Sequence, residues 1–166
     1  MATVPIAAEL RKASTRAGAA EMTASVETGG TASLLKRILI ADDHEMLREG
    51  IRQVLQSEKD WIVCGEAADG QEALEKTLAL SPDLVIVDIN MPIMNGLAAM
   101  RRIRQERPQT KILVFTVNNS DQMAREIITA GADGYVCKSN ASQDLIESIK
   151  TIFEAEPSSR TSPAMA

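Results

Sequence analysis

Residues 84–88 read Leu84-Val85-Ile86-Val87-Asp88, an unbroken apolar run that ends in a carboxylate. The run is short enough to be a strand buried on both faces, as in a parallel sheet covered by helices. Three more runs also end in polar residues: Ile38-Leu39-Ile40-Ala41-Asp42-Asp43, Ile112-Leu113-Val114-Phe115-Thr116 and Tyr135-Val136-Cys137-Lys138. Ligands of open parallel sheets bind just beyond the carboxyl ends of the strands, so three acids, a threonine and a lysine there predict divalent-metal and phosphate chemistry.

Strand-like and helix-like segments alternate along the chain from Lys36 onward. Apolar runs bounded by turn residues predict five strands, at about 36–41, 62–67, 84–88, 111–116 and 134–137. Each strand is followed by a segment whose apolar residues have helical spacing. In the first of these segments they are Met46, Leu47, Gly50, Ile51, Val54 and Leu55, and the second and third segments are residues 70–80 and 97–106. The fourth has Ala124, Ile127 and Ile128 before Gly131, and the fifth, beginning near Ser142, has Leu145, Ile146, Ile149, Ile152 and Phe153.

Five successive strand-helix units predict an α/β fold, a doubly wound parallel sheet with right-handed crossovers and helices on both faces. The expected strand order is the flavodoxin-like 2-1-3-4-5. Residues 1–33 are rich in Ala, Thr, Ser and Gly and have too few large apolar residues for a core, which favours a disordered extension. Residues 34–155 are predicted to form one domain, and residues 156–166, with Pro157 and Pro163, a flexible tail.

Composition excludes several classes of function. A net charge of -5 argues against direct nucleic-acid binding, and we expect the cluster Arg101, Arg102, Arg104 and Arg107 on a solvated helix exterior. The chain lacks the roughly 20 consecutive apolar residues of a membrane span and lacks a secretory h-region, so we expect a soluble, cytoplasmic protein. Cys64 and Cys137 are predicted on opposite edge strands, too far apart for a disulfide, and are expected to be reduced and buried.

The acids at the strand ends suit a hard cation. Mg²⁺ prefers about six oxygen ligands, of which one or two are commonly carboxylates. Asp43 and Asp88 can supply those carboxylates, Asp42 can hold a metal-bound water, and the backbone carbonyl of Asn90 is a further candidate ligand. His44, the only histidine in the chain, is expected to be solvated at the start of a helix, because imidazole suits softer ions.

Asp88 can also act as a nucleophile. A carboxylate attacks phosphorus when cations draw charge from the transferring group, and the product is an acyl phosphate. Lys138 offers a mobile positive charge and Thr116 a hydroxyl, and both could contact the phosphoryl oxygens. The residues therefore predict a phosphoacceptor site in which Asp88, Thr116 and Lys138 act together.

The chain from about Lys36 to Glu154 resembles a response-regulator receiver domain of two-component signalling. The matching residues are Asp42-Asp43, Val87-Asp88-Ile89-Asn90-Met91-Pro92-Ile93-Met94-Asn95-Gly96, Thr116, and Gly131-Ala132-Asp133-Gly134-Tyr135 leading to Lys138. The resemblance implies that Asp88 accepts a phosphoryl group from a histidine kinase or phosphotransfer protein. It also implies that Mg²⁺ binds to Asp43, Asp88 and the Asn90 carbonyl with help from Asp42. Thr116 and Lys138 would bind the phosphoryl group, and Tyr135 would turn inward as Thr116 moves.

Residues 42–51, Asp-Asp-His-Glu-Met-Leu-Arg-Glu-Gly-Ile, are similar to the branch of receivers that usually carries a C-terminal LuxR-type helix-turn-helix domain. A stand-alone receiver and part of a transcription regulator both remain open. The resemblance implies a switch rather than an enzyme, one that catalyses only its own phosphorylation and dephosphorylation. Phosphorylation would alter the surface of the fourth helix, fifth strand and fifth helix, and so control a partner, homodimerisation or a DNA-binding domain.

Two alternatives remain at this stage. A phosphoaspartate hydrolase of the haloacid dehalogenase type also uses a nucleophilic Asp, but it needs a second acid two residues later, where this chain has Asn90. A scaffold that works without phosphorylation would need neither the acids nor the threonine and lysine. The complete set of polar residues at the strand ends argues against the scaffold.

Overall fold

The computed structural model describes residues 35–155, with backbone only at positions 140 and 141. The predictions for residues 1–33 and 156–166 lie outside this described part. Within residues 35–155, no helix is long and apolar enough to cross a membrane.

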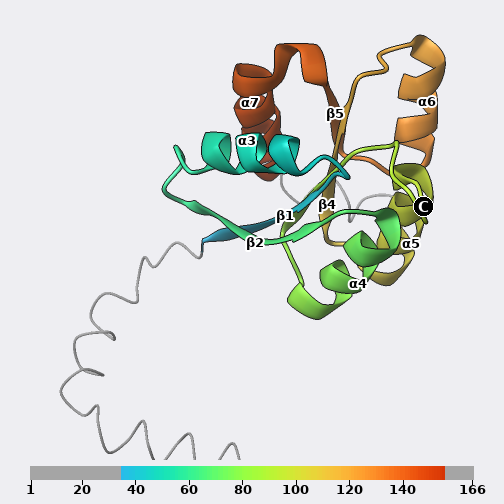
Figure 1. Ribbon diagram of the computed structural model, residues 1–166, viewed down its shortest axis with the longest axis horizontal. Coiled ribbons are helices and arrows are strands. Elements are labelled where there is room, and N and C mark those ends of the chain that lie inside the picture. The colour runs from blue at the N-terminus through green and yellow to red at the C-terminus, as the bar shows by residue number, and fades with distance from the viewer. Residues whose placement is uncertain (1–34, 156–166) are drawn as a thin grey trace, which may run out of the picture. The chain divides into compact units, whose positions relative to one another are not determined.

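The described residues form five parallel strands in the order β2-β1-β3-β4-β5, so the predicted fold class and strand order are confirmed (Figure 1). The strands are β1 (Lys36–Ala41), β2 (Trp61–Ala67), β3 (Leu84–Val87), β4 (Lys111–Thr116) and β5 (Gly134–Cys137). The helices are α3 (Glu45–Leu55), α4 (Gly70–Leu80), α5 (Gly96–Glu106), α6 (Asp121–Thr129) and α7 (Ala141–Glu154), and a single 3-10 turn, η2 (Lys138–Asn140), precedes α7.

Helices cover both faces of the sheet, with α3 and α7 on one and α4, α5 and α6 on the other (Figure 1). Alternate residues of each strand point to opposite faces. Ile38 and Ile40 therefore pack under α3 and α7, whereas Leu39 packs with the α4 side. All four residues of β3 are buried, as expected for the central strand of a sheet covered on both faces.

Polar side chains cap three of the helices. Asp69, Asn95 and Ser120 accept hydrogen bonds from backbone amides in the first turns of α4, α5 and α6, at 2.8, 2.8 and 3.2 Å. Each cap satisfies an amide that has no partner within its helix. These caps set where the helices begin and therefore how the preceding loops leave the carboxyl ends of the strands.

Some residues predicted to face the core do not. Met46 is 89% exposed, Gly50 is exposed, and Ile128 is 65% exposed. A helix lying on a sheet buries only one stripe, and in α3 that stripe contains Ile51 and Leu55. Met46 lies in the first turn and Ile128 one residue past the buried Ile127, so both fall outside their stripes.

Two other expectations need correction. Cys64 and Cys137 are free, as predicted, but they are only half-buried because an edge strand has a neighbour on one side alone. Arg101 and Arg102 are exposed as expected, whereas Arg104 and Arg107 are half-buried, and Arg107 donates to the Leu78 carbonyl at 3.0 Å. The Arg104 guanidinium donates to the carbonyls of Gly131, Pro108 and Thr110 and pairs with Asp133 at 2.8 Å. Arg104 is therefore a structural link between α5 and the turn before β5.

Candidate functional site

Three strands bring polar residues to one edge of the sheet. Ala41 of β1 pairs with Val87 of β3, and Val87 pairs with Val114 of β4. The next residues, Asp42 and Asp88, therefore leave the sheet side by side, close to the end of β4. Their exposed fractions are 1% and 4%, and Thr116 at the end of β4 is also buried. The edge thus holds a cluster of buried polar groups, here called the acidic pocket, as the order of the strands predicted.

Lys138 bridges the two buried carboxylates. Its Nζ lies 2.8 Å from Asp42 Oδ2 and 3.2 Å from Asp88 Oδ2. The lysine follows directly after β5 and reaches across the end of β4, with its ammonium 5.8 Å from the centre of the Phe115 ring. One ammonium therefore neutralises part of the charge of two carboxylates, and the pocket keeps an excess of negative charge.

Burial raises the pKa of Asp88 above 3.8, its ordinary value, because a charged carboxylate is poorly solvated there. The Lys138 ammonium acts in the opposite direction, and the neighbouring Asp42 carboxylate raises the pKa further. The Ile89 amide donates to Asp88 Oδ1 at 2.8 Å and also favours the ionised form. Burial and like-charge repulsion together prevail, so the folded protein holds the Asp88 carboxylate at a cost in stability.

This cost predicts that Asp88→Asn stabilises the metal-free protein. A group with a raised pKa in the folded state contributes stability below its unfolded value, near 3.8, and loses that contribution as the pH rises through the folded pKa. Near neutral pH the uncharged variant should gain about 1 kcal/mol, within the range of single stabilising substitutions. Urea unfolding in EDTA at several pH values measures the gain, which should shrink toward pH 3.8. A variant less stable than the parent at neutral pH would contradict the prediction.

Asp43 and His44 are the exposed members of the acidic cluster. The ring Nδ1 of His44 is 3.0 Å from Asp42 Oδ1 and 3.0 Å from Asp43 Oδ1. The His44 side chain is 69% exposed, so its expected solvated position is confirmed, but the sequence did not predict its contact with both acids. Asp42, Asp43, His44 and Asp88 each offer one ligand atom, and these four atoms lie within 4.8 Å of one another.

This donor set fits a divalent cation. Three carboxylates converge on one small volume, and carboxylate oxygens are the ligands that hard cations such as Mg²⁺ prefer. Lys138 already places one positive charge between two of the acids, and the third, Asp43, has no such ammonium among the ion pairs of the described residues. The predicted acidic cluster of Asp42, Asp43 and Asp88 is therefore present.

The loop from β3 to α5 is tightly turned. Gly96 and Met91 donate backbone hydrogen bonds to the Ile89 carbonyl, at 2.8 and 3.2 Å. Ile93 has a φ of 67°, in the left-handed region. This conformation costs a residue with a side chain roughly 1 to 2 kcal/mol, and the surrounding turns impose it. Asn90 lies exposed in the same loop, and its carbonyl stays a predicted metal ligand.

The two predicted switch residues lie on neighbouring strands. Thr116 Oγ1 accepts a hydrogen bond from the Asn118 amide at 3.2 Å, and the side chain is buried beside the acidic pocket. Tyr135 on β5 is 41% exposed. The tyrosine thus points outward here, and its inward turn with Thr116 stays a prediction about the phosphorylated state.

Sequence reasoning did not single out Arg48. Its Nη1 donates to the backbone carbonyl of Asp42 at 2.7 Å, and its Nε donates to Glu66 at 2.9 Å. In the sequence, Arg48 has the pattern of an ordinary polar residue of an amphipathic helix, and Glu66 lies 18 residues away, on β2. No local pattern identifies such a pair.

The doubly wound parallel sheet places acids, a threonine and a lysine at its carboxyl edge, where ligands of this class of fold bind. The chain belongs to the response regulator receiver domain family, whose model matches residues 38–150. This match confirms the predicted resemblance and function class, a receiver domain of two-component signalling, and does not favour the hydrolase or the scaffold.

Relatives and solved structures agree with this assignment. The chain is 38% identical over 112 residues to the nitrate/nitrite response regulator protein NarL of Escherichia coli K12, covering 68% of this chain and 52% of NarL. It is 34% identical over 118 residues to the transcriptional regulatory protein DegU of Brevibacillus brevis, covering 71% of this chain and 50% of DegU. The chain thus spans about half the length of the curated relatives it matches.

Among solved structures, a two-component response regulator of the LuxR family from Aurantimonas sp. SI85-9A1 is 36% identical. It matches with a TM-score of 0.69 and covers 72% of this chain and 86% of its own. The signal receiver domain of the putative response regulator NarL from Mycobacterium tuberculosis is 27% identical, with a TM-score of 0.69 and coverage of 72% and 97%. Both similarities support the receiver fold, and the first supports the branch that residues 42–51 indicate.

Proposed function

We propose that Asp88 accepts a phosphoryl group from the phosphohistidine of a histidine kinase or phosphotransfer protein. The observation that carries the proposal is the buried Asp88 carboxylate, which shares the Lys138 ammonium with Asp42 inside a cluster of acids. An Asp88 oxygen forms the new bond to phosphorus as the bond from phosphorus to the histidine nitrogen breaks. The donor imidazole keeps the electron pair of that bond.

Asp43 and Asp88 would hold a Mg²⁺ ion with the Asn90 carbonyl, and Asp42 would hold a water bound to it. When bound, the ion supplies positive charge to the phosphoryl oxygens. Lys138 adds a second positive charge at the same place, and the Thr116 hydroxyl donates a hydrogen bond to the transferred group. Burial of Asp42 and Asp88 makes these charge interactions stronger than they are in bulk water.

Phosphorylation adds charge to Asp88, and the new hydrogen bond would draw Thr116 toward it. Tyr135 would turn inward into the space that Thr116 leaves. The surface of α6, β5 and α7 would then change its affinity for a partner, a second copy of the chain or a DNA-binding domain. DegU is named as a transcriptional regulatory protein and NarL as a response regulator, which supports a role in transcription regulation for a longer protein of this kind. We propose the cytoplasm as its location.

The test is phosphorylation of the whole chain by acetyl phosphate with Mg²⁺, followed by intact-protein mass spectrometry. We expect one added phosphoryl group, which should not form when EDTA is present during the reaction and should be absent in Asp88→Asn. Asp60→Asn is the matched control, because Asp60 is an exposed acid just before β2, at the opposite edge of the sheet. Phosphorylation of Asp88→Asn would overturn the assignment of the acceptor. Sustained hydrolysis of small phosphate esters would favour the hydrolase, and no phosphorylation under any of these conditions would favour the scaffold.

A further inference from the structure

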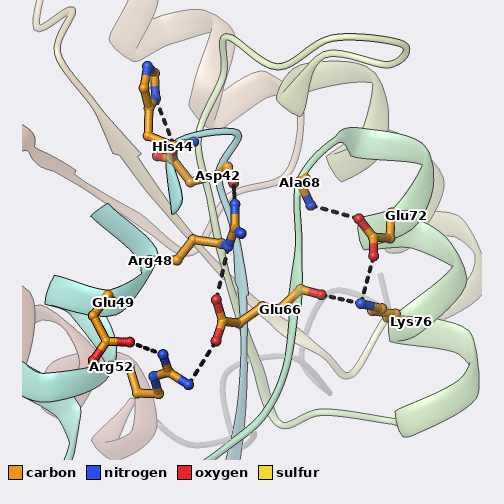
Figure 2. Close-up of polar contacts among 9 residues, drawn as sticks. All are labelled: Asp42, His44, Arg48, Glu49, Arg52, Glu66, Ala68, Glu72 and Lys76. Atoms are coloured by element: carbon orange, nitrogen blue, oxygen red, sulfur yellow. Dashed lines mark hydrogen bonds and ion pairs between the residues drawn. The ribbon is translucent and has the colours of Figure 1, made fainter. Parts of the chain in front are cut away.

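Arg48 joins two strands at the point where the acidic pocket begins (Figure 2). It lies in the first half of α3, and its guanidinium donates to the Asp42 carbonyl at 2.7 Å and to the Glu66 carboxylate at 2.9 Å. Asp42 directly follows β1, and Glu66 lies on β2. A planar guanidinium can serve both acceptors at once with fixed geometry, which a lysine ammonium cannot do.

Glu66 is itself held in place from both sides (Figure 2). Its second carboxylate oxygen lies 3.2 Å from Arg52 Nη1, one turn further along α3. Its backbone carbonyl accepts a hydrogen bond from Lys76 of α4, and Lys76 also pairs with Glu72 at 2.7 Å. Glu66 therefore gives Arg48 an anchor that is tied to two helices and to the sheet.

The segment that Arg48 holds carries two of the three acids of the pocket. The Asp42 amide donates to the Ala67 carbonyl at 3.0 Å, the last backbone link between this segment and β2. The chain then turns into α3, whose N-cap residue, His44, makes no side-chain capping bond. The bond from Arg48 to the Asp42 carbonyl orients the peptide unit between Asp42 and Asp43.

We propose that Arg48 is a positioning residue that sets the directions of the Asp42 and Asp43 carboxylates and thereby the affinity of the pocket for a divalent cation. The inference rests on the proposed function, because it assumes that the pocket binds Mg²⁺. Outer partners that orient metal-binding groups commonly change metal affinity by about tenfold or more when they are removed.

The test compares Arg48→Met with Arg52→Met by isothermal titration of the whole chain with Mg²⁺. Both variants remove one positive charge from α3 and one contact with Glu66, but only Arg48 contacts the Asp42 carbonyl. Each substitution removes the repulsion between an arginine and Mg²⁺, and this effect alone predicts slightly tighter Mg²⁺ binding in both variants. The positioning role predicts the opposite for Arg48→Met, about tenfold weaker binding, with Arg52→Met within about twofold of the parent.

Two further variants complete the test. Arg48→Lys keeps the charge but cannot make the two fixed contacts, so its Mg²⁺ affinity should lie between those of Arg48→Met and the parent. If Arg48→Met does not unfold cooperatively, Glu66→Gln replaces it, with an expected loss of about threefold as the charge-assisted bond weakens. If Arg48→Met folds but binds Mg²⁺ as tightly as the parent or more tightly, the positioning role of Arg48 is wrong, while the proposed metal site still stands. The same conclusion follows if Glu66→Gln replaces it and binds Mg²⁺ as tightly as the parent or more tightly. No Mg²⁺ binding by the parent overturns the proposed metal site as well.

Discussion

Replacing Lys138 by methionine should lower the free energy of unfolding of the metal-free protein by about 3 kcal/mol near neutral pH. The ammonium lies 2.8 and 3.2 Å from the carboxylates of Asp42 and Asp88, which are almost fully buried. Its removal leaves two like charges facing each other without a counter-ion. The loss should become smaller at acid pH, because the raised pKa of Asp88 lets that group take up a proton early.

Urea unfolding in EDTA measures this effect, and Lys150→Met is the matched control. Lys150 pairs with Glu58 at 3.1 Å, but its side chain is about half exposed, and such surface pairs contribute roughly 0 to 1 kcal/mol. Added Mg²⁺ should restore part of the stability lost in Lys138→Met, because the ion would neutralise the same carboxylates. A Lys138→Met protein as stable in EDTA as the control would show that the pocket tolerates its unpaired charges.

Gly96→Ala should destabilise the protein by about 3 kcal/mol and slow phosphorylation of Asp88. A Cβ atom at Gly96 would lie 2.1 Å from the Asp88 carbonyl oxygen and 2.8 Å from Ile89 Cα. Both contacts are with backbone, so no side chain can turn away to relieve them. The start of α5 or the end of β3 must therefore move, and the second movement would displace the acceptor carboxylate.

Gly50→Ala is the control for this substitution. Gly50 lies inside α3, and a Cβ atom added there would have no neighbouring atom within 4 Å, so alanine should stabilise the helix by about 0.5 to 1 kcal/mol. Thermal unfolding and the rate of phosphorylation by acetyl phosphate are measured for both variants. A Gly96→Ala protein with parent-like stability and rate would mean that the loop after β3 yields without moving Asp88.

The buried charges of the pocket destabilise the metal-free protein, and the same charges favour binding of a cation. Two carboxylates and one ammonium are buried where a fully neutral arrangement would be more stable, as the raised pKa of Asp88 indicates. A cation or a phosphoryl group with its cation can relieve this imbalance. The same repulsion that lowers the stability of the metal-free protein therefore favours the binding that the proposed function requires.

Much of the site was predictable because strand ends are local features. An apolar run followed by a carboxylate predicts a buried strand with an acid at its carboxyl end, and the structure places Asp42 and Asp88 in this way. The exposed positions of Met46 and Ile128 were not predictable from spacing alone. Helical spacing shows that a residue lies near the buried stripe, but the packing angle of the helix decides where the stripe ends.

The sequence by itself determined the α/β fold, its strand order, and the position of Asp42, Asp88 and Thr116 at one edge of the sheet. Local periodicity and the order of strands and helices along the chain carry that information. Only the tertiary structure showed that Lys138 bridges two acids, one of them 96 residues away, and that Arg48 joins Asp42 to Glu66. The close contact of Gly96 with Asp88 also appeared only there. Such pairings depend on sheet register and side-chain reach between distant segments, and these leave no pattern in neighbouring residues.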